Sequence, residues 1–114
     1  MPHSGPSMTP EQVQTLRRLA LNEPETTSEV MGGGFVEVSS LDPRTSAVIR
    51  IAALVSISSD ASTFRWAMDL AQAAGVDDSN VFDTLMSIAP IVGVARLTSA
   101  IPYVLAALDL EVVD

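Results

Sequence analysis

Two segments of this chain are apolar on almost every side, and this feature limits its possible folds more than any other. They run from Ala47 to Ile57 and from Ile91 to Leu108. Each is long enough for about three or more helical turns, and a helix that is apolar all round must be covered on every side. A chain of 114 residues offers few other helices to cover both. We therefore predict a homo-oligomer.

The composition favours helices over strands. Hydrophobic residues make up 47% of the chain, but aromatic residues only 4%. A core must then be built mainly from Ala, Val, Ile, Leu and Met, which suits closely packed helices better than a sandwich of strands. We predict an all-α fold, a compact domain of about five to six helices.

Capping residues and helix breakers divide the chain into segments. Thr9 with Gln12 predicts a capping box, and this first helix runs to about Asn22. Pro24 opens a short polar segment that stops at the three glycines from Gly32. Residues 1–8 are predicted to be a disordered tail, and residues 9–114 a single helical domain.

The rest of the chain repeats these signals. An Asp or Ser at a cap position predicts the start of a helix, and glycine and proline predict its end or a bend. The predicted segments are a helix from Asp42 to about Ser58, one from Asp60 or Ser62 to Gly75, one from Asp77 with a kink or break at Pro90 and Gly93, and one from Ile91 to Leu110 with a bend at Pro102.

Charge and apolar length exclude several classes of partner. The formal net charge is −8, all basic residues are arginine apart from one histidine, and there is no cysteine. Such a surface repels nucleic acid and anionic lipid, and neither disulfides nor cysteine-based zinc sites can form. No apolar run reaches the ~20 residues of a bilayer span, and the N-terminus does not read as a secretory signal. We predict a cytoplasmic protein that binds neither nucleic acid nor membrane.

The available side chains also limit the chemistry. Without Cys or Lys, and with His3 alone in the tail, a Ser-His-Asp triad, a Cys-His pair or a Schiff base cannot be assembled in the folded body. Carboxylates, arginines, hydroxyls and Tyr103 remain. Because the aspartates lack the spacing of a calcium loop and several stand where helices begin, we interpret them as caps and expect neither a metal nor a cofactor.

Arginines and large side chains supply the candidate ligand contacts. Arg50 and Arg96 are each the one charge of an otherwise apolar segment, which fits either a paired arginine at an interface or a clamp for a ligand carboxylate. Trp66 and Tyr103 either line a pocket or pack in the core. Met68 and Met86 are interpreted as core residues.

Two stretches carry a resemblance to a known family. They are "LDPRTSAVIRIAAL", which starts at Leu41, and "FRWAMDLAQAAGVDDSNVFDTLMSIAPIVGVARLTSAI", which starts at Phe64. In their order and spacing they resemble the carboxymuconolactone decarboxylase family, which includes the alkylhydroperoxidase D-like proteins. The resemblance covers roughly Thr15 to Leu108, and it implies the alkylhydroperoxidase D-like fold and assembly into trimers or hexamers.

The same resemblance places the family's reactive groups on residues that lack them. The redox cysteines and histidine of the peroxidase branch would fall on Asp60, Thr63 and Ala67. The decarboxylase branch has a histidine where "FRWAM" has Ala67. The peroxidase reaction through a cysteine pair is therefore excluded, and the resemblance implies a family member without the usual catalytic residues.

Three functional hypotheses follow. The leading one is a non-catalytic oligomer that binds a small molecule or has a structural role, with a pocket near Ala67. The second is an altered lyase or isomerase acting on a small organic acid or lactone, with arginine holding the carboxylate and Asp60, Asp69 or Tyr103 moving protons. The third is a hetero-oligomer whose partner supplies the missing histidine. The predicted ligand-binding residues are Arg50, Arg65, Trp66, Arg96 and Tyr103.

Overall fold

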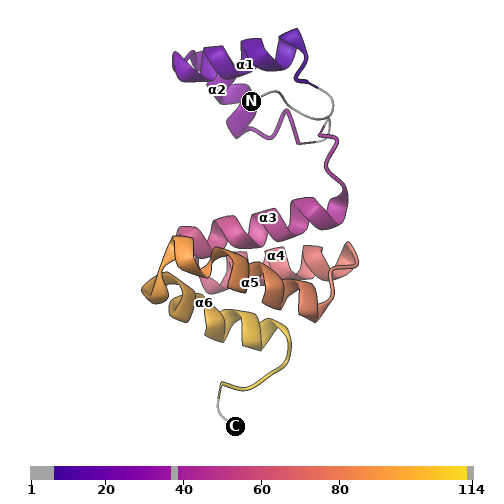
Figure 1. The fold of residues 1–114 in the computed structure, drawn as a ribbon, viewed down its shortest axis with the longest axis vertical. Helices are drawn as coiled ribbons and strands as arrows, with labels where there is room; N and C mark the ends of the chain where they lie inside the picture. Colours follow the sequence, from indigo (N-terminus) through magenta and orange to yellow (C-terminus); the bar gives the residue numbers. More distant parts are fainter. Residues whose placement is uncertain (1–6, 37–38, 113–114) are drawn as a thin grey trace. The chain divides into compact units, whose positions relative to one another are not determined.

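The described part of the chain is entirely helical. A computed structural model describes residues 7–36 and 39–112, which contain six helices and no strand (Figure 1). The predicted all-α class is therefore confirmed. None of the helices in these ranges has the length and apolar character needed to cross a membrane.

The chain separates into two compact units, Met1–Ser40 and Leu41–Asp114. Most of the predicted tail, residues 1–6, lies outside the described residues, while Ser7 and Met8 are exposed just before the first helix. The single domain over residues 9–114 stays a prediction, and each unit is described by itself below.

The first unit contains α1 (Pro10–Ala20) and α2 (Pro24–Met31). The predicted capping box is present: the Gln12 N–H donates to Thr9 Oγ1 at 3.1 Å, and the Thr9 N–H donates to Gln12 Oε1 at 2.9 Å. These two bonds satisfy backbone donors that the first turn of a helix leaves unpaired. As predicted, α2 ends at the glycines, and Gly32 is its C-cap.

The first unit buries almost nothing apolar. No residue of α1 is buried, and the buried residue of α2 is Thr26, whose hydroxyl donates to Glu23 Oε1 at 2.9 Å. The apolar residues Val13, Leu16 and Leu19 nevertheless recur every three positions along α1, which places them along one side of the helix. Leu16 is 52% exposed while Val13 and Leu19 are half-buried, so this side of α1, the α1 stripe, is only partly covered.

The second unit contains α3 (Pro43–Ser56), α4 (Ala61–Ala73), α5 (Asp78–Val92) and α6 (Val94–Ala107). The first three helices begin alike. The carboxylates of Asp42, Asp60 and Asp77 each accept a backbone N–H from three residues downstream at 2.8 Å. The predicted aspartate caps are therefore confirmed.

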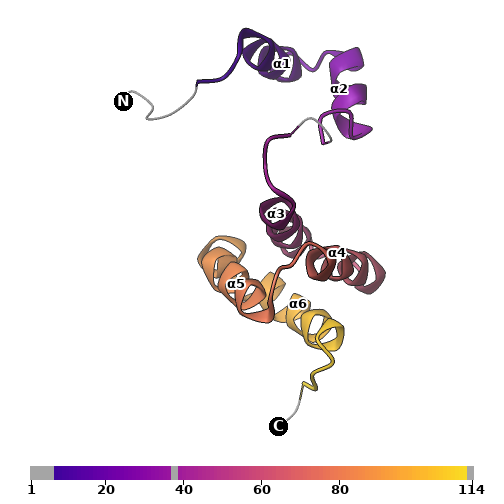
Figure 2. The same cartoon turned by 90° about the vertical axis from the view of Figure 1, so that its right-hand side faces the viewer.

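These four helices pack into a bundle, seen nearly along the helix axes in Figure 2. Helix α3 contacts α4, α5 and α6, and α6 also contacts α4 and α5. Helices α3 and α5 run in the same direction, and near their starts Arg44 Nη2 donates to Asn80 Oδ1 at 3.2 Å. The ends of α3 and α5 and the start of α6 consequently lie at one end of the bundle (Figure 1).

The boundary between the last two helices differs from the sequence prediction. We expected a kink or break at Pro90 and Gly93 and a last segment that starts at Ile91. The break at Gly93 is confirmed, but α5 continues through Pro90, and α6 starts at Val94 rather than at Ile91. Gly93 has φ 88° and ψ 161°, a region that side chains disfavour and glycine adopts readily. The glycine therefore sets the break.

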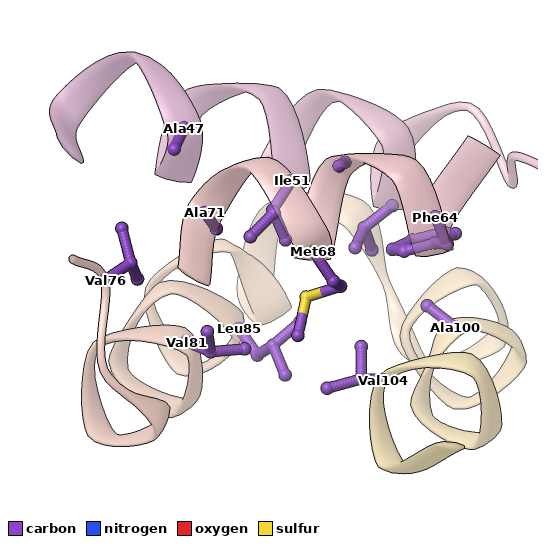
Figure 3. Packing of buried hydrophobic residues seen from close by; sticks show 12 residues of the cluster. Ala47, Ile51, Phe64, Met68, Ala71, Val76, Val81, Leu85, Ala100 and Val104 are labelled. Carbon is purple, nitrogen blue, oxygen red and sulfur yellow. The ribbon is translucent and has the colours of Figure 1, made fainter. Parts of the chain in front are cut away.

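The core lies among the four helices of the second unit. Figure 3 shows Met68 reaching from α4 toward Leu85 of α5 and Val104 of α6. Complete burial of a side chain of this size contributes roughly 1.5–3 kcal/mol. The buried cluster comprises Ala47, Ile51, Val55, Phe64, Ala67, Met68, Ala71, Val76, Val81, Leu85, Ala100 and Val104.

Candidate functional site

The start of α4 is a helix cap at the positions where the resemblance places reactive groups. Asp60 Oδ1 accepts the Thr63 N–H at 2.8 Å and the Ser62 hydroxyl at 2.9 Å. These bonds, the Thr63 N–H first among them, lower the pKa of Asp60. Asp60 is therefore held as a carboxylate that stabilises the helix start, and it is poorly suited to donate a proton near neutral pH.

Ala67 is part of the core. Its exposed fraction is 1%, and it belongs to the same buried cluster as Phe64 and Met68. The position that the resemblance gives to histidine is thus closed to solvent here. Trp66, the preceding residue, is 53% exposed and lies toward the outside of α4.

Two of the predicted ligand-binding residues share a cavity between α4 and α6. Arg65 and Tyr103 line a space of about 370 Å³ together with Ser62 and three alanines. The Tyr103 ring packs against Phe64, with ring centroids 5.9 Å apart. Because the Ser62 hydroxyl donates to Asp60, the donors that this cavity can offer to a ligand are the Arg65 guanidinium and the Tyr103 hydroxyl. We call this space the Arg65 cavity.

The Arg65 guanidinium has a weak internal partner. Its Nε lies 3.6 Å from Asp69 Oδ1, and both side chains are more than half exposed. An exposed pair at this distance contributes little to stability. A ligand carboxylate, which can accept two parallel N–H bonds from a guanidinium, competes with such a pair.

Two other predicted residues form a separate pair. The Arg50 guanidinium of α3 lies over the ring of Trp66 of α4, 5.4 Å from its centroid. This contact is a cation–π interaction, worth about 0.5–1 kcal/mol at an exposed site. It links two helices and fits the interpretation of Arg50 as a paired arginine.

Arg96 is not among the residues that line the Arg65 cavity. It lies in the first turns of α6 and is exposed. The five predicted residues are therefore not gathered in one site: the structure brings Arg65 together with Tyr103 and Arg50 together with Trp66.

The sequence prediction missed an apolar groove between α5 and α6. Its walls are Phe82, Leu85 and Met86 on α5, and Ile101 and Leu105 on α6 with the C-cap Leu108, around a space of about 360 Å³. Met86 was predicted to be a core residue, but its side chain is exposed here. The signal was a run of apolar pairs, Val81–Phe82 and Leu85–Met86, which makes a stripe too wide for one neighbouring helix to cover.

The acidic residues do not gather into a metal centre. Within residues 7–36 and 39–112, no three histidine, aspartate or glutamate side chains lie close enough to hold an ion together. The carboxylates of Asp42 and Asp60 are used as caps, and hydrogen bonds lower the pKa of each.

Comparison with known proteins leaves the family open. No protein-family model, curated protein or solved structure matches this chain. The likeness to the carboxymuconolactone decarboxylase family therefore rests on the quoted motifs alone.

The pKa of Asp60 predicts how acid affects this helix start. A lowered pKa means that the carboxylate stabilises the fold above its unfolded pKa of about 3.9, and that this stabilisation is lost as pH falls through the folded pKa. Asp60→Asn keeps a capping oxygen but does not titrate. We therefore expect the melting temperature of Asp60→Asn to fall less than that of the wild type when the pH is lowered from about 5 to about 3. Thermal unfolding at each pH measures this difference.

Asp60→Ala is the matched variant for the cap itself. It removes the acceptor and is expected to lower the melting temperature at neutral pH, where Asp60→Asn should change it little. Equal melting temperatures for Asp60→Ala and the wild type at neutral pH would contradict the capping role.

Proposed function

We propose that this chain is a non-catalytic, carboxymuconolactone decarboxylase-like protein that works as a homo-oligomer with a structural role. The observation that supports the proposal is the exposure of large apolar side chains on the second unit. Ile57, Ile91 and Val94 are 70%, 84% and 77% exposed. They belong to the end of the bundle where α3 and α5 finish and α6 begins (Figure 1), and we call them the apolar end.

An interface explains the apolar end better than chance exposure does. Single exposed apolar residues are ordinary, but several large ones at one end of a small helical unit are typical of a surface that binds protein. Burying an aliphatic side chain of this size contributes roughly 1.5–3 kcal/mol. The proposed oligomer is a trimer or hexamer, the assemblies that the family resemblance implies.

Introducing negative charge at the apolar end tests whether this surface holds the oligomer together. Ile91→Asp combined with Val94→Asp places two carboxylates in the proposed interface, where their desolvation is costly. We expect the mass measured by light scattering to fall toward the 12.0 kDa of one chain, with the helical circular dichroism signal retained.

The control for this test is Gln72→Asp. Gln72 is exposed near the end of α4, away from the start of α6, so it adds a charge without touching the apolar end. An unchanged assembly mass in the double variant would contradict the proposed interface, as would an equal loss of mass in Gln72→Asp.

A second candidate function is the binding of a small organic acid. It is favoured by the Arg65 cavity, which places a guanidinium and a phenol on one space of about 370 Å³. This is the combination of one cation and one neutral donor that can orient a carboxylate. The cavity size suits a small molecule at the lower end of the usual range of ligand pockets.

Thermal unfolding with small carboxylic acids and lactones tests this candidate. A ligand that binds only the folded chain adds roughly 2.7 kcal/mol at about a hundredfold excess over its dissociation constant. We expect one chemical class to raise the melting temperature of the wild type and of Arg96→Gln, but not of Arg65→Gln. Equal shifts in Arg65→Gln and Arg96→Gln would show that the Arg65 cavity is not the binding site.

The altered lyase or isomerase has less support than these two. It calls for a carboxylate that can hold a proton near neutral pH, and Asp60, one of the groups named for that step, has a lowered pKa. The hetero-oligomer in which a partner supplies a histidine also has less support, because Ala67, beside which that histidine would act, is buried in the core.

A further inference from the structure

We infer that the groove between α5 and α6 receives helix α1 of a second copy of this chain. The inference rests on the homo-oligomer proposed above and names one contact within it. Two apolar surfaces of the described residues are only partly covered: the α1 stripe and the groove. They match in kind, because amphipathic helices commonly bind by laying their apolar side into a groove between two helices.

The groove is apolar at its centre and acidic at its edge. Phe82 and Met86 are exposed within it, while Asp78 is also part of its lining. Leu110, which lines the groove as well, stands between Asp109 and Glu111 in the sequence. No lysine or arginine contributes to the lining. The groove therefore favours an apolar partner that carries positive charge.

Helix α1 has that chemistry. Its stripe is only partly buried, with Leu16 52% exposed and Val13 and Leu19 half-buried. Arg17 lies in the last turn beside the stripe, while Arg18 pairs with Glu23 at 3.6 Å. From Val13 to Leu19 the helix rises about 9 Å. The groove runs along about two turns of α5, from Asp78 to Met86, or about 12 Å. The two surfaces thus agree in length as well as in charge.

The same charges disfavour pairing of two identical grooves. Such a contact would bring the Asp78 carboxylate of one copy toward the acidic edge of the other, and like charges that face each other across an interface cost binding energy. A contact between α1 of one copy and the groove of another joins unlike surfaces. Such contacts produce closed rings or longer chains of subunits, depending on the rotation between copies.

The absence of cysteine from the chain allows a direct test. Leu16→Cys is made in one preparation of the full chain, and Met86→Cys is made in a second preparation that carries a size tag. The two are mixed and oxidised, and the products are separated without reductant. We expect the mixed disulfide to form several-fold faster than either homodimer, and to form more slowly when Arg17→Glu is added to the first variant.

The control replaces Leu16→Cys by Leu21→Cys. Leu21 is the C-cap of α1 and is largely exposed, and five residues after Leu16 it points about 140° away from Leu16 around the helix axis. If Leu21→Cys joins Met86→Cys as fast as Leu16→Cys does, the proposed contact is overturned.

Light scattering on the same samples separates this inference from the proposed assembly. A mass of several chains together with a preferred disulfide between the Leu16→Cys and Met86→Cys variants supports both. A mass of several chains without that preference overturns the α1 contact and leaves the homo-oligomer standing. A mass of one chain at every concentration overturns both.

Discussion

Phe64→Ala is expected to lower the free energy of unfolding by about 3–5 kcal/mol, the usual cost of deleting a buried aromatic ring. Phe64 is 1% exposed in the core of the second unit and also contacts the Tyr103 ring. Truncation leaves a cavity between α4 and α6 that the surrounding helices can fill only in part. Urea unfolding followed by circular dichroism measures the loss.

Phe82→Ala provides the matched control for this prediction. Phe82 is 59% exposed, so at low protein concentration its truncation is expected to cost about 0.5 kcal/mol or less. Similar losses for the two phenylalanines would contradict the placement of Phe64 in the core. A loss for Phe82→Ala that grows with protein concentration would place Phe82 in an interface between copies.

Ala67→His is expected to destabilise the fold by about 1–3 kcal/mol. Histidine is much larger than alanine, and position 67 is buried among Phe64, Met68 and Ala71. An imidazole placed there is also removed from water, which favours its neutral form and lowers its pKa below about 6.5.

The sign of the pH effect follows from that lowered pKa. Below about pH 6.5 the unfolded chain binds a proton at this histidine more readily than the folded chain does. The stability deficit of Ala67→His relative to the wild type should therefore grow as the pH falls from about 7 to about 5. Thermal unfolding across this range measures the change.

Ala73→His is the control for the histidine prediction. Ala73 lies on the same helix but is exposed, so a histidine there should cost little and should add little pH dependence. If Ala67→His retained full stability and gained turnover of a muconolactone, position 67 would lie in an accessible pocket and its placement in the core would be wrong.

The places where helices begin could be predicted from the sequence because they depend on residues close together in the chain. Thr9 with Gln12 forms its capping box, and Asp42, Asp60 and Asp77 cap α3, α4 and α5. Each cap needs only one side chain and a backbone N–H three residues away. The break before α6 was harder to place, because Pro90 and Gly93 both signal one and the left-handed φ of Gly93 decides it.

The candidate site could be predicted only in part, since it depends on residues far apart in the sequence. Arg65 and Tyr103 were both predicted, but only the packing of α4 against α6 places them on one cavity and sets Arg50 over Trp66 instead. The groove between α5 and α6 was missed for the same reason. An apolar residue such as Met86 has the same pattern in the sequence whether it faces the core or the groove.

The sequence by itself determined the helical class and the starts of the capped helices α1, α3, α4 and α5, because composition and capping act locally. The tertiary structure decided which sides of those helices are buried. On α3, Ala47, Ile51 and Val55 are buried while Ile49 is exposed, although all four are apolar. On α4, packing buries Ala67 and leaves Trp66 exposed to solvent. When a helix is apolar on most sides, its own sequence does not determine which side is buried. Packing against the neighbouring helices of the bundle determines it.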